Sequence, residues 1–236
     1  MLTVPEAQDR VAHLVEAATK AGADAADAIY FCDASTSVSM RLGALEDVSR
    51  SEGEGIGLRL FVGRRSAGVA TTEMDTDSLT TLVDRALAMA KEAPEDPYAG
   101  LAPADMLMRE QPRDLDLDDG SEADPQMLRA RALEVEDAAR AIKGVTNSEG
   151  GSAGHSRTRI AIATSTGFVG GYGTSGHSTS AAVLAGEGSD MQRDYDWHSA
   201  HHLEDLRSAA SIGALAGERA IAKVNPVVKR VQPKLP

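Results

Sequence analysis

One stretch of the sequence, residues 37–72, restricts the possible folds of this chain more than any other. Apolar and polar residues alternate in it over four short runs. A period of two places successive side chains on opposite faces of a β-sheet. Turn residues separate the runs at Gly43-Ala44, Gly53-Glu54 and Gly63-Arg64, where positive φ angles are needed. The stretch therefore predicts a half-buried antiparallel meander.

The alternation also predicts which side chains of the meander lie in the core. Two sets of apolar residues each share one face: Val38, Met40 and Leu42, and Ile56, Leu58 and Leu60. The residues between them, such as Ser39, Arg41 and Arg59, fall on the opposite face. We therefore expect one buried face and one outer face that carries arginine and serine.

The rest of the chain repeats the same arrangement of helix, meander and helix. Apolar residues recur at helical spacing in four segments: residues 3–22, 77–93, 121 or 124 to 141, and 205–224. Strand patterns occupy residues 25–32, 145–148, 158–164, 168–175, 178–185 and 191–197, with turns at Thr166-Gly167 and Ser175-Gly176-His177. These patterns predict an α+β fold, in which amphipathic helices pack on one face of antiparallel sheet meanders, arranged as two similar lobes.

A segment rich in proline and acidic residues interrupts this pattern at residues 94–125. We interpret it as a linker or an extended surface strap, because scattered leucine and methionine residues can anchor it. The sequence then divides into a first lobe (1–93), this strap (94–125) and a second lobe (126–226).

Charge and cysteine content narrow the class of protein. The net charge is −12, and residues 92–136 hold thirteen acidic and four basic residues. Such a surface repels a phosphate backbone, so no nucleic-acid partner is expected. The single cysteine, Cys32, lies in an apolar run and is expected to be a buried thiol in a reducing compartment. No apolar run is long enough to span a bilayer, so we expect a cytoplasmic protein without a membrane partner.

The residues that most resemble metal ligands are three histidines near the end of the chain, His198, His201 and His202. On a helix, His198 and His202 would face one way, as the zinc ligands of an HExxH site do. The second residue here is Ser199 rather than the glutamate that acts as general base. The preceding residues are typical of a strand, where positions four apart lie about 13 Å from each other. We therefore expect no metal site, with His198 and His202 as the candidates to test.

The glycine- and serine-rich strands favour a different kind of contact. The segment 51–57 lacks the Lys-Ser/Thr that completes a phosphate-binding loop, and the pair Ser175/His177 has no third catalytic member. Strands with small outward side chains leave backbone groups accessible, which suits capture of an extended peptide by strand addition. The peptide-facing or interface residues predicted on this basis are Arg59, Ser49, Ser51, Thr174 and Ser178. Alternatively, these polar strands face solvent or a partner subunit.

Six strings resemble the TldD/PmbA (TldE) family, and they occur in the family's order over nearly the whole chain. They are SRSEGEGIGLRLFVGRRSAGVATT, PEDPYAGL, NSEGG, ATSTGFVGGYGTSGHSTS, GSDMQRDYDW and SIGALAGERAIAKVNP. The resemblance is to the N-terminal region of the PmbA/TldE branch. It implies that a C-terminal domain begins at residues 227–236, and that the zinc motif HExxxH belongs to that domain in the catalytic TldD branch.

The resemblance also implies a function. Members of this branch pair with a TldD-type subunit in a cytoplasmic metalloprotease that processes or degrades peptides and small unfolded proteins. For this chain we therefore expect no catalytic residue and no cofactor of its own, with zinc in the partner subunit. Its role would be assembly, with a TldD-type subunit or as a homodimer, and accommodation of an extended peptide. The alternatives are a stand-alone binding or assembly module without protease activity, and an independent zinc enzyme that uses His198 and His202.

Overall fold

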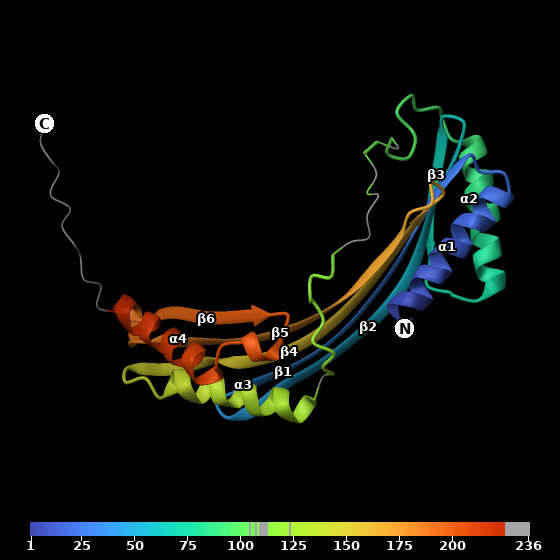
Figure 1. Ribbon diagram of the computed structural model, residues 1–236. Helices are drawn as coiled ribbons and strands as arrows, with labels where there is room; N and C mark the ends of the chain where they lie inside the picture. The colour runs from blue at the N-terminus through green and yellow to red at the C-terminus, as the bar shows by residue number, and fades with distance from the viewer. Residues whose placement is uncertain (104, 107, 109–112, 123, 225–236) are drawn as a thin grey trace, which may run out of the picture. The chain divides into compact units, whose positions relative to one another are not determined.

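The computed structural model describes residues 1–103, 105–106, 108, 113–122 and 124–224 (Figure 1). Six strands form one antiparallel sheet in the order β3-β2-β1-β4-β5-β6, accompanied by four helices, which confirms the predicted α+β fold. The strands are β1 (Ala25–Arg41), β2 (Ala44–Val62), β3 (Arg65–Thr71), β4 (Val145–Thr164), β5 (Val169–Ala185) and β6 (Gln192–Ala200). The helices are α1 (Val4–Lys20), α2 (Thr76–Glu92), α3 (Pro125–Arg140) and α4 (Ala209–Val224), with short 3₁₀ turns η1 (Gly188–Asp190) and η2 (Leu203–Asp205). Within the described residues, no helix has both the length and the apolar character to cross a membrane.

The chain forms two compact units, each assembled from three separate segments. Unit 1 comprises Met1–Ala34, Ser51–Asp119 and Arg157–Ser175, and unit 2 comprises Ser35–Arg50, Gly120–Ser156 and the residues from Gly176 onward. Strands β1, β2, β4 and β5 each contribute to both units. Two similar lobes that follow one another along the chain are not confirmed. The boundaries at 93 and 126 stay a prediction, and residues 227–236 lie outside the described residues.

The core of unit 1 lies between its strands and helices α1 and α2. Thr3 and Glu6 form the reciprocal capping box that starts α1, and Asp75 caps α2. The apolar stripes of both helices pack on strand residues that include Cys32, Ile56, Leu58 and Leu60, all buried as predicted. Leu58 is only 1% exposed.

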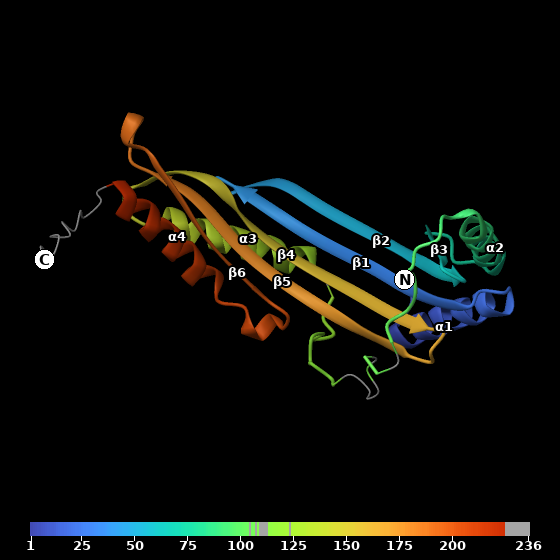
Figure 2. The same ribbon diagram turned by 90° about the horizontal axis from the view of Figure 1, so that it is seen from above.

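The core of unit 2 depends on close packing of α3 and α4, which run alongside each other in Figure 2. Val135 and Ala139 of α3 meet Ile212 and Ala216 of α4 over the strand residues Ala181, Val183 and Ala185. Gly213 permits this approach, because a Cβ atom there would lie 2.1 Å from the carbonyl oxygen of Val135. Met127 of α3 lies outside this core and is exposed.

The strands are longer and fewer than predicted. Gly43, Gly63 and Gly167 do adopt positive φ angles at turns. The predicted turns at Gly53-Glu54 and Ser175-Gly176-His177 are wrong, since these residues lie inside β2 and β5. Neither Gly53 nor Gly176 has a positive φ angle, and extended backbone accommodates glycine without a reversal.

Candidate functional site

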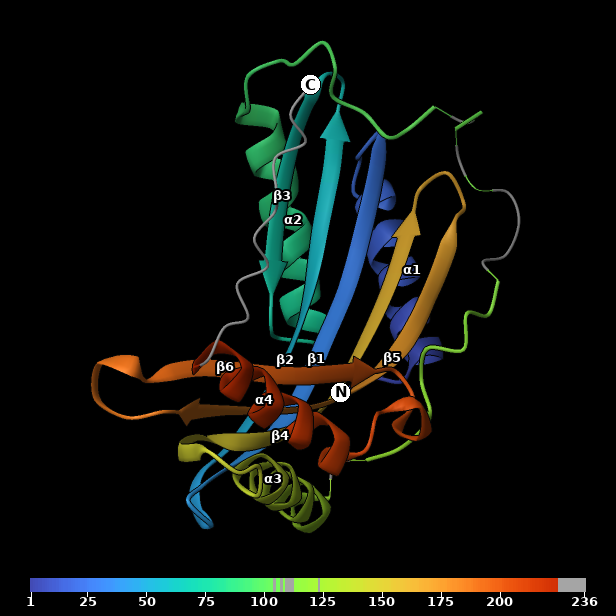
Figure 3. The ribbon, with the colours of Figure 1, turned by 90° about the vertical axis from the view of Figure 1, so that its left-hand side faces the viewer.

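Residues 44–50 of β2 form one edge of the unit 2 sheet, here called the free edge. β3 pairs with β2 only from Ile56 to Val62, so no strand in the described part of the chain lies outside residues 44–50. Figure 3 shows the shorter β3 beside the upper part of β2. Every residue of this free edge is exposed, including Val48 at 53%. An edge strand presents backbone N–H and C=O groups to a further strand. The free edge therefore has the geometry to accept an extended chain.

A buried carboxylate on α3 fixes the turn that leads into the free edge. Glu136 is fully buried and accepts hydrogen bonds from the backbone N–H groups of Leu42 (2.7 Å) and Gly43 (3.0 Å). Leu42 has a φ of +52° and is 53% exposed. The prediction that Leu42 shares the buried face of Val38 and Met40 is wrong, because the chain reverses at Leu42.

The face of the unit 2 sheet turned away from α3 and α4, here called the open face, carries small polar side chains. Ser39, Ser152 and Ser180 line a shallow trough of about 330 Å³ on it. Arg193 and Tyr195 of β6 lie at one side of this trough. Arg193 also donates to Glu149 Oε2 at 2.6 Å. The trough thus combines a serine floor with an aromatic and charged margin.

Arg193 stacks over the Tyr195 ring, with its guanidinium carbon 5.6 Å from the ring centroid. Tyr195 and the neighbouring Trp197 are 49% and 58% exposed. In the sheet register Tyr195 lies opposite Ala182 and Trp197 lies opposite Ser180, so both aromatic rings stand beside small residues of β5. Both aromatic side chains are therefore about half exposed on the open face.

The structure does not gather the five predicted peptide-facing residues into one set. Ser49 belongs to the free edge, and Ser178 is an exposed residue of β5 in unit 2. Arg59, Ser51 and Thr174 belong to unit 1. The guanidinium of Arg59 pairs with Asp27 and lies over the Phe61 ring. Its hydrogen bonds to the Asp27 carboxylate raise the pKa of Arg59. The role of these residues in peptide contact stays a prediction.

The histidines near the end of the chain are placed in a strand and the turn after it. His198 lies in β6, and its Nδ1 atom accepts the backbone N–H of Arg207 at 3.3 Å. His202 precedes the 3₁₀ turn η2. Among the described residues, no group of three or more His, Cys, Asp or Glu side chains is arranged to hold a metal ion. The expectation that this chain holds no metal site stays a prediction.

Sequence reasoning missed a second histidine pair, which is buried. His155 of β4 and His177 of β5 have ring centroids 5.0 Å apart, and the Oγ atom of Ser121 lies 3.4 Å and 3.3 Å from their Nε2 atoms. A hydroxyl carries one proton, so Ser121 can donate to one ring and must accept from the other. The contact holds the segment before α3 against the strands. Each histidine sits in a run of small residues that alternate inward, which was the available signal.

The comparisons with known proteins agree on one family. Residues 33–90 match the family model described as PmbA/TldA metallopeptidase domain 1, and residues 112–224 match the PmbA/TldA metallopeptidase central domain. The metalloprotease PmbA of Escherichia coli O157:H7 is 31% identical over 80% of this chain and 42% of its own length. A PmbA homologue from Haemophilus influenzae is 29% identical over 94% of this chain and 49% of its own length. The chain thus spans about half the length of these curated relatives.

Solved structures share the fold. A candidate modulator of DNA gyrase from Bacteroides thetaiotaomicron superposes with a TM-score of 0.82 at 23% identity, over 94% of this chain and 50% of the other. TldE from Thermococcus kodakarensis superposes with a TM-score of 0.76 at 17% identity, over 90% of this chain and 47% of the other. Together with the two matched domains, these relatives show that the chain belongs to the PmbA/TldD family and corresponds to the N-terminal region of its PmbA/TldE members.

Proposed function

We propose that this chain is the N-terminal region of a PmbA/TldE-like subunit in a TldD/TldE-type metalloprotease, which processes or degrades peptides and small unfolded proteins. Within that assembly it is non-catalytic and accommodates an extended peptide. The observation that carries the proposal is the free edge, residues 44–50, which is exposed throughout and starts at a turn held by Glu136. Family membership supports the peptidase context.

Strand addition suits a protease that takes many substrates. The backbone groups of an edge strand bind any extended chain, because they do not depend on the side chains of the partner. The free edge also offers Leu45 and Val48 as exposed apolar contacts beside Glu46 and Asp47. These residues provide contact area without a deep pocket that would select one sequence.

Zinc, in this proposal, belongs to a TldD-type partner subunit. A metallopeptidase needs a metal-polarised water and a base beside the scissile bond. His198 of β6 accepts the backbone N–H of Arg207, a contact that supports a structural role for this histidine. The partner is therefore expected to supply the chemistry, and this chain to supply part of the surface that holds the peptide.

A binding measurement with a matched control tests the proposal. A fluorescein-labelled, unstructured peptide is titrated with the chain and followed by fluorescence anisotropy. Val48→Lys places a charge on the free edge, which opposes strand pairing, and should weaken binding by at least about tenfold. Met89→Lys, at an equally exposed apolar position on α2, should leave binding unchanged. Equal binding by the Val48→Lys variant, or no binding by the unmodified chain, would contradict the proposal.

Assembly is tested separately by mixing the chain with a TldD-type subunit. Co-elution in size-exclusion chromatography would support a heteromeric assembly. A chain that binds the peptide but never a TldD-type subunit would favour the alternative, a stand-alone binding module.

A further inference from the structure

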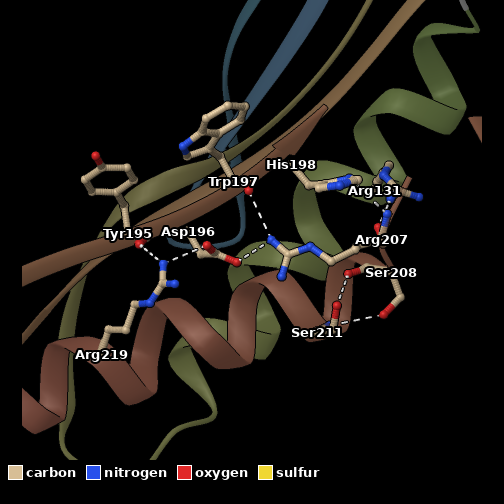
Figure 4. A network of polar contacts seen from close by, with 9 residues as sticks. All are labelled: Arg131, Tyr195, Asp196, Trp197, His198, Arg207, Ser208, Ser211 and Arg219. Atoms are coloured by element: carbon tan, nitrogen blue, oxygen red, sulfur yellow. Dashed lines mark hydrogen bonds and ion pairs between the residues drawn. The ribbon is translucent and has the colours of Figure 1, made fainter. Parts of the chain in front are cut away.

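The opposite edge of the unit 2 sheet, strand β6, differs from the free edge because basic side chains occupy its backbone carbonyl groups. β6 is the last strand of the sheet, with β5 on one side and no further strand on the other in the described part of the chain. Three alternate carbonyl oxygens, those of Arg193, Tyr195 and Trp197, each accept a hydrogen bond from a cation of α4 or the segment before it. Figure 4 shows the contacts at Tyr195 and Trp197.

The donors follow the strand in order. Lys223 Nζ lies 3.2 Å from the Arg193 oxygen, Arg219 Nη1 lies 3.3 Å from the Tyr195 oxygen, and Arg207 Nη2 lies 3.0 Å from the Trp197 oxygen. Lys223 and Arg219 are one turn apart on α4, which packs along β6. Alternate residues of an edge strand direct their C=O groups the same way. The three cations therefore form a row, here called the carbonyl cap.

Carboxylates between the carbonyl groups hold each cation in place. Asp196 is 5% exposed and accepts from both Arg207 Nη2 and Arg219 Nη1 at 2.7 Å. Asp194 accepts from Lys223 Nζ at 2.8 Å. The carboxylate side chains are largely buried, at 7% exposed for Asp196 and 15% for Asp194, whereas the three cations are 38–52% exposed. Each cation is thus held against the strand by a carboxylate that is itself fixed in place.

The segment before α4 is also fixed. The backbone N–H of Arg207 donates to His198 Nδ1, and its carbonyl oxygen accepts from Arg131, whose Nε atom donates to Thr179. Arg207 is thus tied to α3 through Arg131 and to β6 through His198 and Asp196, as the sticks in Figure 4 show. The two backbone contacts hold the main chain of Arg207, from which its side chain reaches the Trp197 carbonyl group.

We propose that the carbonyl cap of Arg207, Arg219 and Lys223 closes the β6 edge to strand addition, both by a second copy of this chain and by an extended peptide. An added strand needs the same carbonyl oxygens as acceptors, so it must first displace the cations. Closure of this edge would prevent self-association, because β6 exposes Tyr195 and Trp197 on the open face. Two uncapped β6 edges would bring such aromatic residues into cross-strand pairs, which stabilise a sheet.

Removing the cap tests this inference. The triple variant Asp194→Asn/Arg219→Ala/Lys223→Ala uncovers the Arg193 and Tyr195 carbonyl groups and leaves Asp196 paired with Arg207. Its control, Asp137→Asn/Arg140→Ala/Lys143→Ala, removes the same charges from exposed positions at the end of α3. Hydrogen–deuterium exchange and light scattering are measured for both variants over a hundredfold range of protein concentration.

The capped chain and the control should show no concentration-dependent protection at residues 192–200. The uncapped variant should gain at least about tenfold protection there as it associates, since paired amides exchange through opening. A folded, uncapped variant without that gain would overturn the proposal. If the triple variant does not fold, the milder Asp194→Asn/Lys223→Ala variant, which uncovers one carbonyl group at the end of α4, is judged by the same criterion. Neither outcome depends on peptide binding at the free edge.

Discussion

The contact between α3 and α4 offers the sharpest prediction, since two opposing effects act at Gly213. Replacing glycine by alanine inside an exposed helix stabilises it by about 1 kcal/mol. Here, however, the new Cβ atom would lie 2.1 Å from the Val135 carbonyl oxygen and 2.9 Å from the Ala139 nitrogen. Backbone atoms cannot rotate away as a side chain does, so the helices must separate.

Separation of α3 and α4 loosens the packing of Val135, Ala139, Ile212 and Ala216, all of which are fully buried. Overpacking in a core costs about 1–3 kcal/mol, and a clash with backbone lies at the upper end of that range. After subtracting the gain in helix propensity, Gly213→Ala should lower the free energy of unfolding by about 2 kcal/mol. For a chain of this size that corresponds to a fall in Tm of about 4–8 °C.

Urea denaturation followed by circular dichroism measures this loss. Gly53→Ala is the matched control, because Gly53 has no left-handed φ angle and no atom within 4 Å of the new Cβ position. The control should change stability by no more than about 0.5 kcal/mol. A Gly213→Ala variant as stable as the unmodified chain would refute the packing argument.

Four further predictions concern the core, the β6 network and the chemistry. Leu58→Ala should cost about 2–5 kcal/mol in urea denaturation, and a loss below about 1 kcal/mol would mean that Leu58 is not a core residue. Burial raises the pKa of Asp194, but hydrogen bonds from Lys223 and the Tyr195 amide, with the charges of Lys223 and Arg219, outweigh it, so the native pKa lies below 3.8. Asp194 therefore contributes stability that is fully present above pH 3.8 and is lost as the pH falls through the native pKa. The difference in unfolding free energy between the unmodified chain and Asp194→Asn should shrink over that pH range, and a difference that stays constant would contradict this prediction. Chain purified without a histidine tag should hold no tightly bound zinc by mass spectrometry, whereas one equivalent lost in His198→Ala/His202→Ala would reverse our interpretation. The chain alone should not cleave an unfolded peptide, and chelator-sensitive cleavage would reveal a metal site.

The sequence predicted the helices and the core of unit 1 well, because both depend on local periodicity. The capping box at Thr3 and Glu6 and the alternation at Ile56, Leu58 and Leu60 are short-range signals, and the structure contains both. Strand lengths were less predictable. Glycine marks a turn only where the backbone adopts positive φ, as at Gly43, and sequence alone does not distinguish this from the extended Gly53.

The contacts that define the candidate site were not predictable, because they join residues far apart in the chain. Glu136 lies ninety-four positions from Leu42, and its neighbours on α3 suggested an ordinary amphipathic helix. The carbonyl cap likewise requires the register between β6 and α4 to be known. Charge alternation in β6, with Asp194 and Asp196 two apart, was the one visible sign that one face of this strand would meet cations.

We propose that the two edges of the unit 2 sheet differ: an extended peptide pairs with the free edge, and the carbonyl cap closes the β6 edge. Hydrogen–deuterium exchange of the unmodified chain, with and without an excess of an unstructured peptide, measures both edges in one experiment. We predict added protection at residues 44–50 and none at residues 192–200. Protection confined to residues 192–200, or none at residues 44–50 at a saturating peptide concentration, would contradict the account.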